Sequence, residues 1–320
     1  MAERARECGG ARLRPVRVTG VDLLGAWARR LEEGAGPELG AASWIVSRVF
    51  ERALVRPLER PAPGPRVIAI GGATLGGSCK TPLALVCAEE LAQVARVAVV
   101  GHGYRGGGGP GDDARFLERR ARGRFEVHAG PTRAEAFQRA SARADVVILD
   151  GPLQIAPRHA DLSLLALDAA SPFSTGRVFP GGDLRATPAR LLAVADLAVP
   201  VTVTLRAADV ADLGGARVGV VTAIARPDRF ASACRALGVR VVRHLRFRDH
   251  GPIDPERLER STREDRLDVW ITTEKCALHV PAARTAGVPI RAISADFSVS
   301  HTVRDRLHAL ASGIGESGPA

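Results

Sequence analysis

A glycine-rich segment, residues 71–81, holds the residue types that bind a phosphate chain. It reads Gly-Gly-Ala-Thr-Leu-Gly-Gly-Ser-Cys-Lys-Thr, and it follows a short apolar run and precedes a helix-like stretch. Glycines let backbone N–H groups approach phosphate closely, a lysine reaches the terminal phosphates, and a threonine hydroxyl ligates Mg²⁺. We therefore expect Lys80 and Thr81 to fill these roles for a bound ATP. The expected nucleotide contacts are Thr74, Leu75, Gly76, Gly77, Ser78, Cys79, Lys80 and Thr81.

This segment departs from the usual phosphate-loop pattern at Thr74 and at Cys79, which stands where a glycine normally precedes the lysine. If the backbone needs a positive φ at Cys79, its Cβ costs about 1 kcal/mol. A helix N-terminus and the adjacent Lys80 favour a thiolate, so we expect Cys79 to be alkylated readily and ATP to slow the reaction. The alternative is a glycine-rich strand-to-helix turn without a ligand.

Charge and composition favour an anionic partner other than nucleic acid. The formal net charge is +10, and aromatic residues make up 4% of the chain with one tyrosine, so platforms for stacking bases are scarce. Lys80 and Lys275 are the only lysines, which suggests that a compact ammonium is needed at both places. Five cysteines without a C-x-x-C pair indicate a reducing compartment. The sequence contains no apolar run of 18 residues, so we expect no membrane-spanning helix.

Short apolar runs alternate with helical stretches after residue 63, which predicts an α/β fold. We expect a P-loop NTPase-like, mostly parallel sheet with flanking helices, a smaller C-terminal α/β domain and an N-terminal amphipathic helix. The expected strands are 67–70, 97–100, 125–127, 146–149, 162–167, 197–203, 218–221, 239–242, 269–272 and 290–293, with helices at about 81–94, 131–142, 227–236 and 254–260. The expected divisions are a tail and interfacial helix at 1–63, a P-loop kinase core at 64–205 and a C-terminal α/β domain at 206–320.

The stretch from about residue 39 to 58 has an apolar face and a stripe of arginines at every fourth position. An apolar face with Trp and Phe beside such a stripe is typical of a helix lying on an anionic membrane surface. A helix packed against its own domain with a solvated arginine face remains the alternative.

Later motifs extend the pattern of the phosphate loop in a fixed order. They are Gly103-Tyr-Arg-Gly106, Gly111-Asp-Asp113, Asp150-Gly-Pro-Leu-Gln154, Phe179-Pro-Gly-Gly-Asp-Leu-Arg185, Ala225-Arg-Pro-Asp-Arg-Phe230, Phe247-Arg-Asp-His250 and Thr273-Glu-Lys275. Together with the loop, this series resembles the tetraacyldisaccharide 4'-kinases, the lipid A 4'-kinases of Gram-negative envelope synthesis. The resemblance covers about residues 40–300.

The resemblance implies transfer of the ATP γ-phosphate to the 4'-hydroxyl of a tetraacyl glucosamine disaccharide 1-phosphate, the lipid A disaccharide precursor. It implies that Lys80 neutralises the phosphates and that Thr81 and Asp150 hold Mg²⁺. Asp112 would be the catalytic carboxylate with His250 as its partner, although Asp113 could be the true equivalent. The protein would be cytoplasmic and peripheral on the inner face of the inner membrane.

Several positions differ from the family pattern. The second of the paired aspartates is Gly151, the aspartate after Thr-Glu-Lys is Cys276, and the glutamate after Leu-Arg is Ala186. These differences keep a second hypothesis open, a catalytically weakened or non-catalytic descendant that binds nucleotide or lipid. A soluble P-loop NTPase acting on another substrate would leave the amphipathic stretch unexplained.

Overall fold

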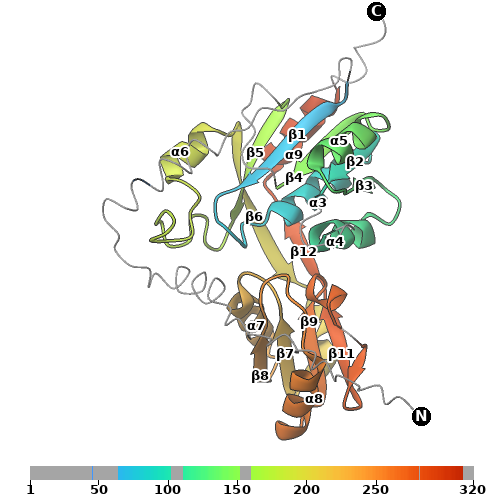
Figure 1. Ribbon diagram of the computed structural model, residues 1–320, viewed down its shortest axis with the longest axis vertical. Coiled ribbons are helices and arrows are strands. Elements are labelled where there is room, and N and C mark those ends of the chain that lie inside the picture. The colour runs from blue at the N-terminus through green and yellow to red at the C-terminus, as the bar shows by residue number, and fades with distance from the viewer. Residues whose placement is uncertain (1–44, 46–63, 102–110, 152–159, 281, 313–320) are drawn as a thin grey trace, which may run out of the picture.

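The computed structural model describes residue 45 and residues 64–101, 111–151, 160–280 and 282–312. These residues form two sheets with helices on their faces (Figure 1). The expected amphipathic helix at 39–58, apart from Ile45, and the Gly103-Tyr-Arg-Gly106 motif lie outside the described residues, as do residues 152–154 of the motif after Asp150.

The first sheet has seven strands in the order β12-β6-β5-β1-β4-β2-β3. Every neighbouring pair is parallel except β12 and β6, which are antiparallel, so the expected mostly parallel sheet is confirmed. Its strands are β1 (Arg66–Gly72), β2 (Val97–Val100), β3 (Glu126–His128), β4 (Val146–Asp150), β5 (Leu162–Asp168), β6 (Leu197–Leu205) and β12 (Ala295–Ser298).

Helices cover both faces of this sheet, and this explains why the central strands are apolar at nearly every position. In β1, Ile68 and Ile70 point to one core and Val67 and Ala69 to the other, because side chains alternate along a strand. The first core is closed by helices α3 (Lys80–Leu91), α4 (Asp112–Ala121) and α9 (His301–Ser312), and the second by α5 (Arg133–Ser141). Helix α6 (Pro188–Ala193) packs through Leu191 near β5.

The second sheet has five strands in the order β10-β11-β9-β7-β8, and α7 and α8 contribute to different cores on it. Trp270 is fully buried beneath α8, where its indole N–H donates a 2.7 Å hydrogen bond to Thr262 Oγ1. The elements are β7 (Val218–Thr222), α7 (Pro227–Ala236), β8 (Val241–Arg246), α8 (Pro255–Glu264), β9 (Val269–Thr273), β10 (Arg284–Thr285) and β11 (Val288–Ile293), with the short 3₁₀ helices η2 (Ala207–Asp209), η3 (Ala211–Leu213) and η4 (Cys276–Leu278).

The chain returns to the first sheet after β11. Strand β12 pairs antiparallel with β6, as Figure 1 shows between the two sheets, and α9 then packs against α3. Phe297 of β12 contacts Phe116 of α4 edge-to-face with 6.3 Å between ring centroids, which gives this segment an apolar anchor on the first core. Residues 295–312 thus belong with the first sheet, whereas the sequence-based division grouped them with the second. As a division into domains, the boundary at residues 205/206 stays a prediction.

Among the described residues, none of the helices combines the length and apolar character needed to cross a bilayer.

Candidate nucleotide-binding and phosphotransfer site

The glycine-rich segment forms a loop between the end of β1 and the start of α3. A neighbouring segment supports it through the backbone: Leu75 N–H donates to the Asp183 carbonyl and Arg185 N–H donates to the Ala73 carbonyl, each at 2.9 Å. Thr74 is buried, and its hydroxyl donates to the Gly76 carbonyl at 2.6 Å. Thr74 therefore holds the shape of the loop from within and does not line the cavity described below.

Two glycines of the loop leave no room for a side chain. A Cβ at Gly72 would lie 2.1 Å from the Ser78 hydroxyl oxygen. Gly77 has a φ of +67°, and a Cβ there would lie 2.7 Å from Arg226 Cδ. Cys79 caps α3 with φ 58° and ψ 27°, a left-handed conformation that an L-residue adopts only at a cost. The condition under which the Cβ of Cys79 carries a cost, a positive φ, is therefore met.

Lys80 is the first residue of α3, and its ammonium lies 3.3 Å from the Ser78 hydroxyl. Burial lowers the pKa of Lys80, and the nearby Arg185 guanidinium lowers it further, whereas the Asp150 and Asp113 carboxylates oppose the shift. The helix N-terminus and this concentration of positive groups make the loop a site for an anion.

Asp150 ends β4, next to β1 in the sheet, and it meets Thr81 at the start of α3. The Thr81 hydroxyl donates to Asp150 Oδ2 at 2.8 Å, while the buried Oδ1 accepts no hydrogen bond within the described part of the chain. Burial raises the pKa of Asp150 to about 6, and the Asp113 carboxylate contributes to the rise. A buried carboxylate oxygen without a partner, beside a threonine hydroxyl, is a donor set that suits Mg²⁺.

Gly151 stands where the family pattern quoted above has a second aspartate. It has a φ of +69°, and a Cβ there would lie 3.3 Å from Lys80 Cε. Its backbone therefore favours glycine. No group of three or more His, Cys, Asp or Glu residues that could hold a metal occurs among the described residues. A cation beside Asp150 would take its remaining ligands from nucleotide and water, as Mg²⁺ commonly does.

Asp112 and Asp113 begin α4 on the other side of the site, where two negative charges stabilise the helix N-terminus. Asp112 Oδ2 lies 2.8 Å from His250 Nδ1, and Asp113 Oδ1 lies 2.8 Å from Lys275 Nζ. Burial would raise the pKa of Asp113, but the Lys275 ammonium outweighs it and holds this pKa at about 2. No helix was expected at Asp112 from the sequence. The structure places Asp112 at the start of α4, largely shielded from solvent.

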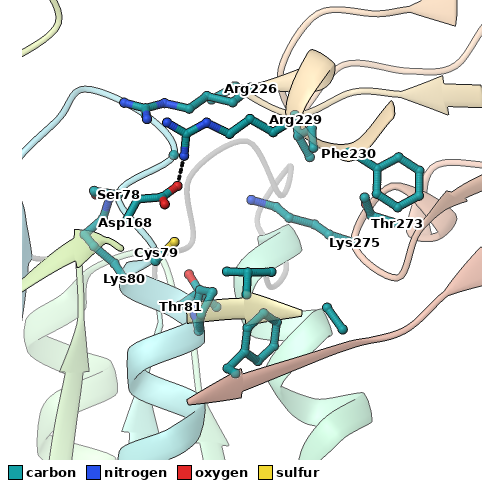
Figure 2. A pocket seen from close by; sticks show the side chains of 18 of the residues that line it. Ser78, Cys79, Lys80, Thr81, Asp168, Arg226, Arg229, Phe230, Thr273 and Lys275 are labelled. Carbon is teal, nitrogen blue, oxygen red and sulfur yellow. Dashed lines mark hydrogen bonds and ion pairs between the residues drawn. The ribbon is translucent and has the colours of Figure 1, made fainter. Parts of the chain in front are cut away.

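One cavity of about 1040 Å³ lies between the two sheets and joins these groups. Figure 2 shows Lys80 and Thr81 on one side of it and Lys275 pointing in from the other, with Arg226 and Arg229 above Ser78. Asp112 is not among the lining residues and reaches the cavity through His250, whereas Asp113 lines it directly. The lining includes the expected residues Leu75, Gly76, Gly77, Ser78, Cys79, Lys80, Thr81, Asp150 and His250.

Arginines from α7 and the residue before it cross from the second sheet to the first. Arg226 donates to Asp183 at 2.9 Å in a pair whose side chains are 7% and 6% exposed, and Arg229 forms an ion pair with Asp168. The sequence offered a signal for both arginines, since they fall within the quoted motif 225–230, but none for their carboxylate partners. Lys275, which had no assigned role, is now placed against Asp113.

The surroundings of Cys79 disfavour the thiolate that the sequence led us to expect, and the ready alkylation of Cys79 stays a prediction. Burial raises the pKa of the Cys79 thiol even though Arg229, Arg226 and Lys80 act to lower it. The sequence shows the helix start and the neighbouring lysine, which favour the thiolate, but it does not show how deeply the sulfur is shielded from water.

A parallel sheet with a phosphate loop after its central strand, and with a carboxylate at the end of the adjacent strand, defines a P-loop nucleotide-binding protein. The model of the family described as tetraacyldisaccharide-1-P 4'-kinase (LpxK) matches residues 39–210 and 193–312. The chain belongs to the tetraacyldisaccharide 4'-kinase family.

Relatives in this family are about one-third identical to the chain. The tetraacyldisaccharide 4'-kinase of Anaeromyxobacter dehalogenans (strain 2CP-C) is 31% identical over 317 residues, covering 80% of this chain and 83% of that protein. The corresponding protein of Methylobacterium radiotolerans is 30% identical and covers 88% and 96%. Aquifex aeolicus LpxK, solved in complex with ATP, is 18% identical with a TM-score of 0.59 over 86% of this chain and 98% of that one, which shows the shared fold.

Proposed function

We propose that the protein transfers the γ-phosphate of ATP to the 4'-hydroxyl of a tetraacyl glucosamine disaccharide 1-phosphate, a step of lipid A biosynthesis. The observation that carries the proposal is one cavity with the phosphate loop and the Thr81–Asp150 pair on one side and, on the other, His250, whose Nδ1 contacts Asp112 behind the cavity wall. Membership of the tetraacyldisaccharide 4'-kinase family supports the substrate.

The nucleotide phosphates would bind the loop backbone from Leu75 to Thr81, with Lys80 at the β- and γ-phosphates. Thr81 and Asp150 would hold Mg²⁺, which supplies positive charge to the phosphate oxygens. Arg185 lines the same cavity and is fixed by its Nε, which donates to the Thr74 carbonyl at 2.9 Å. Phosphoryl transfer depends on such positioning and charge neutralisation, because the protein forms no covalent bond to the phosphorus.

On the acceptor side, Asp112 would take the proton of the attacking hydroxyl as the new O–P bond forms and ADP leaves. His250 would hold Asp112 in place through the 2.8 Å contact to Oδ2. A positioned base of this kind contributes about 10²–10⁴-fold in rate. Asp113 stays the alternative base, although its ion pair with Lys275 and its pKa of about 2 make it a weak proton acceptor.

We place the protein in the cytoplasm, peripheral on the inner face of the inner membrane, where a lipid-linked sugar presents its reacting hydroxyl. The support is the net charge of +10 and the amphipathic pattern at 39–58. Flotation with anionic liposomes tests this placement: a chain that begins at Pro61 should lose most of the binding shown by the full chain. Equal flotation of the two would remove residues 39–58 from membrane contact.

The deciding experiment follows labelled γ-phosphate into the tetraacyl disaccharide 1-phosphate, in detergent with Mg²⁺. The wild type should produce labelled lipid, and Lys80→Ala should lower the yield by at least about 10²-fold, since it removes a charge that neutralises the transferred phosphate. Comparing Asp112→Asn with Asp113→Asn identifies the base, because the larger loss of kcat marks it.

A second candidate function is a nucleotide- or lipid-binding protein without kinase activity. The observations that favour it are Gly151 in the place of the second aspartate and the Cβ of Cys79 within the loop. ATP binding by calorimetry with no wild-type turnover above Lys80→Ala would establish this candidate in place of the kinase.

A further inference from the structure

Asp112 has a second histidine neighbour that the proposed mechanism has not used. His279 Nε2 lies 2.6 Å from Asp112 Oδ2, the same oxygen that His250 Nδ1 approaches to 2.8 Å. An ionised carboxylate only accepts hydrogen bonds, so both ring nitrogens must carry the hydrogen. A neutral His250 ring can donate from Nδ1 and a neutral His279 ring can donate from Nε2, which are opposite tautomers. The carboxylate can therefore have two hydrogen-bond donors without two added positive charges.

The turn that carries His279 is fixed to both sheets. It follows β9 as η4, and Cys276 within it is fully buried with its Sγ accepting a 3.1 Å hydrogen bond from Ala223 N–H. His279 N–H donates to the Cys276 carbonyl at 2.9 Å, and the side chain of Leu278 packs against the core of the first sheet. Lys275, at the start of the same turn, binds Asp113. One short turn thus contacts both carboxylates that begin α4.

We propose that His279 is a positioning residue that, with His250, fixes the orientation of the Asp112 carboxylate for proton transfer. This inference rests on the proposed function of Asp112 as the base. The torsion that turns an aspartate carboxylate is broad, so one hydrogen bond leaves the plane of the group loosely defined. A second donor arriving at the same oxygen from another element restricts that rotation.

The arrangement also separates the tasks of the two carboxylate oxygens. Both histidines bind Oδ2, whereas Oδ1 accepts no hydrogen bond from any residue that the structure describes. Oδ1 is therefore the oxygen left to accept a proton, and because Asp112 does not line the cavity, the sugar hydroxyl would have to approach it beside His250, which does. Asp112 is 13% exposed and His279 is 18% exposed, so water competes little for these contacts.

The test compares His279→Ala, His279→Gln and wild type in the lipid phosphorylation assay. Loss of orientation should lower kcat about tenfold in His279→Ala while the KM for ATP changes less than about twofold, because misplacement of a base affects the transition state more than binding. His279→Gln, whose amide nitrogen can replace Nε2, should recover most of the loss. His301→Ala, an exposed histidine at the start of α9, is the matched control and should behave as wild type.

A double-mutant comparison distinguishes action through Asp112 from a general structural role. If His279 acts through Asp112, adding His279→Ala to Asp112→Asn should change kcat by less than about twofold, since the residue it orients is already inactive. An equal loss in both backgrounds, or an unchanged kcat in His279→Ala, would overturn the inference. These outcomes leave the kinase proposal standing, because wild-type turnover is measured in the same series.

A spectroscopic measurement covers the case in which the wild type does not turn over. In ¹⁵N-histidine NMR of the full chain, His279 should show a slowly exchanging Nε2 proton that disappears in Asp112→Ala. That signal in a protein without turnover would support the His279–Asp112 contact while the kinase proposal fails. Its absence in the wild type, or its persistence in Asp112→Ala, would refute the contact itself.

Discussion

Replacing Cys79 by glycine should stabilise the protein, because Cys79 holds a left-handed backbone conformation at φ 58° and ψ 27°. This conformation costs an L-residue about 1–2 kcal/mol. Glycine removes that cost, but it lowers the free energy of unfolding by about 0.4–1 kcal/mol because it gives the unfolded chain more conformational freedom. The net gain in unfolding free energy is therefore about 0–1.6 kcal/mol, and its midpoint of about 0.8 kcal/mol corresponds to a rise of about 2–3 °C in Tm for a domain of this size.

Differential scanning calorimetry without nucleotide measures the effect, and Cys79→Ala is the control. Alanine keeps the Cβ and loses only the sulfur, so its Tm should not rise above that of the wild type. The difference between the glycine and alanine variants then isolates the backbone term. A glycine variant no more stable than the alanine variant would refute the claim that the loop is strained at this position.

Three further changes probe the site and its supports. Burial raises the pKa of Asp150 to about 6, against about 3.9 in an unfolded chain. The folded state therefore holds this proton more tightly than the unfolded chain does. The resulting contribution to the free energy of unfolding is complete below about pH 4 and is lost as the pH rises through about 6. Asp150→Asn should therefore raise Tm at pH 8 and not at pH 4. In the wild type, the Mg²⁺-dependent affinity for ATP, measured by calorimetry, should fall about tenfold for each pH unit below pH 6. Gly77→Ala should lower ATP affinity by at least about tenfold, since its Cβ meets Arg226, whereas Gly123→Ala, with a φ of +80° and open space, should leave affinity unchanged. Asp183→Ala should cost about 3–5 kcal/mol in urea unfolding, because it removes the carboxylate from a buried arginine; a loss under 1 kcal/mol would show the pair to be dispensable.

The buried strands were predictable because helices cover both faces of their sheets. Strand β2 and helix α7 have the bounds that the apolar pattern predicts. Strand β12 was not predicted, because its four residues are too few for an alternation with a period of two to stand out. Helix α4 was also missed, since it follows a glycine run and its segment is rich in charge, leaving few apolar residues to mark a period.

The phosphate loop was predictable because its residues are contiguous in the sequence. Its glycines, lysine and threonine are each explained by a direct contact expected with phosphate or Mg²⁺. Asp150 was predictable from the end of an apolar strand and from family resemblance. The contacts of Asp112 with His279 and of Arg226 with Asp183 were not, because they join residues 167 and 43 positions apart. Such contacts depend on how the elements pack, and no short-range pattern specifies them.

The antiparallel alignment of Leu205 with Ala295 means that the chain leaves the first sheet and re-enters it at adjacent points. A two-residue hairpin turn could join these two positions and replace everything between them, as it does in ordinary antiparallel pairs. The shortened polypeptide would keep the phosphate loop, Asp150 and Asp112, and it would lose His250 and His279 together. The phosphate loop and the histidines that orient the base are thus encoded by separable stretches of the gene. The stretch that encodes the histidines lies wholly within the stretch that encodes the first sheet.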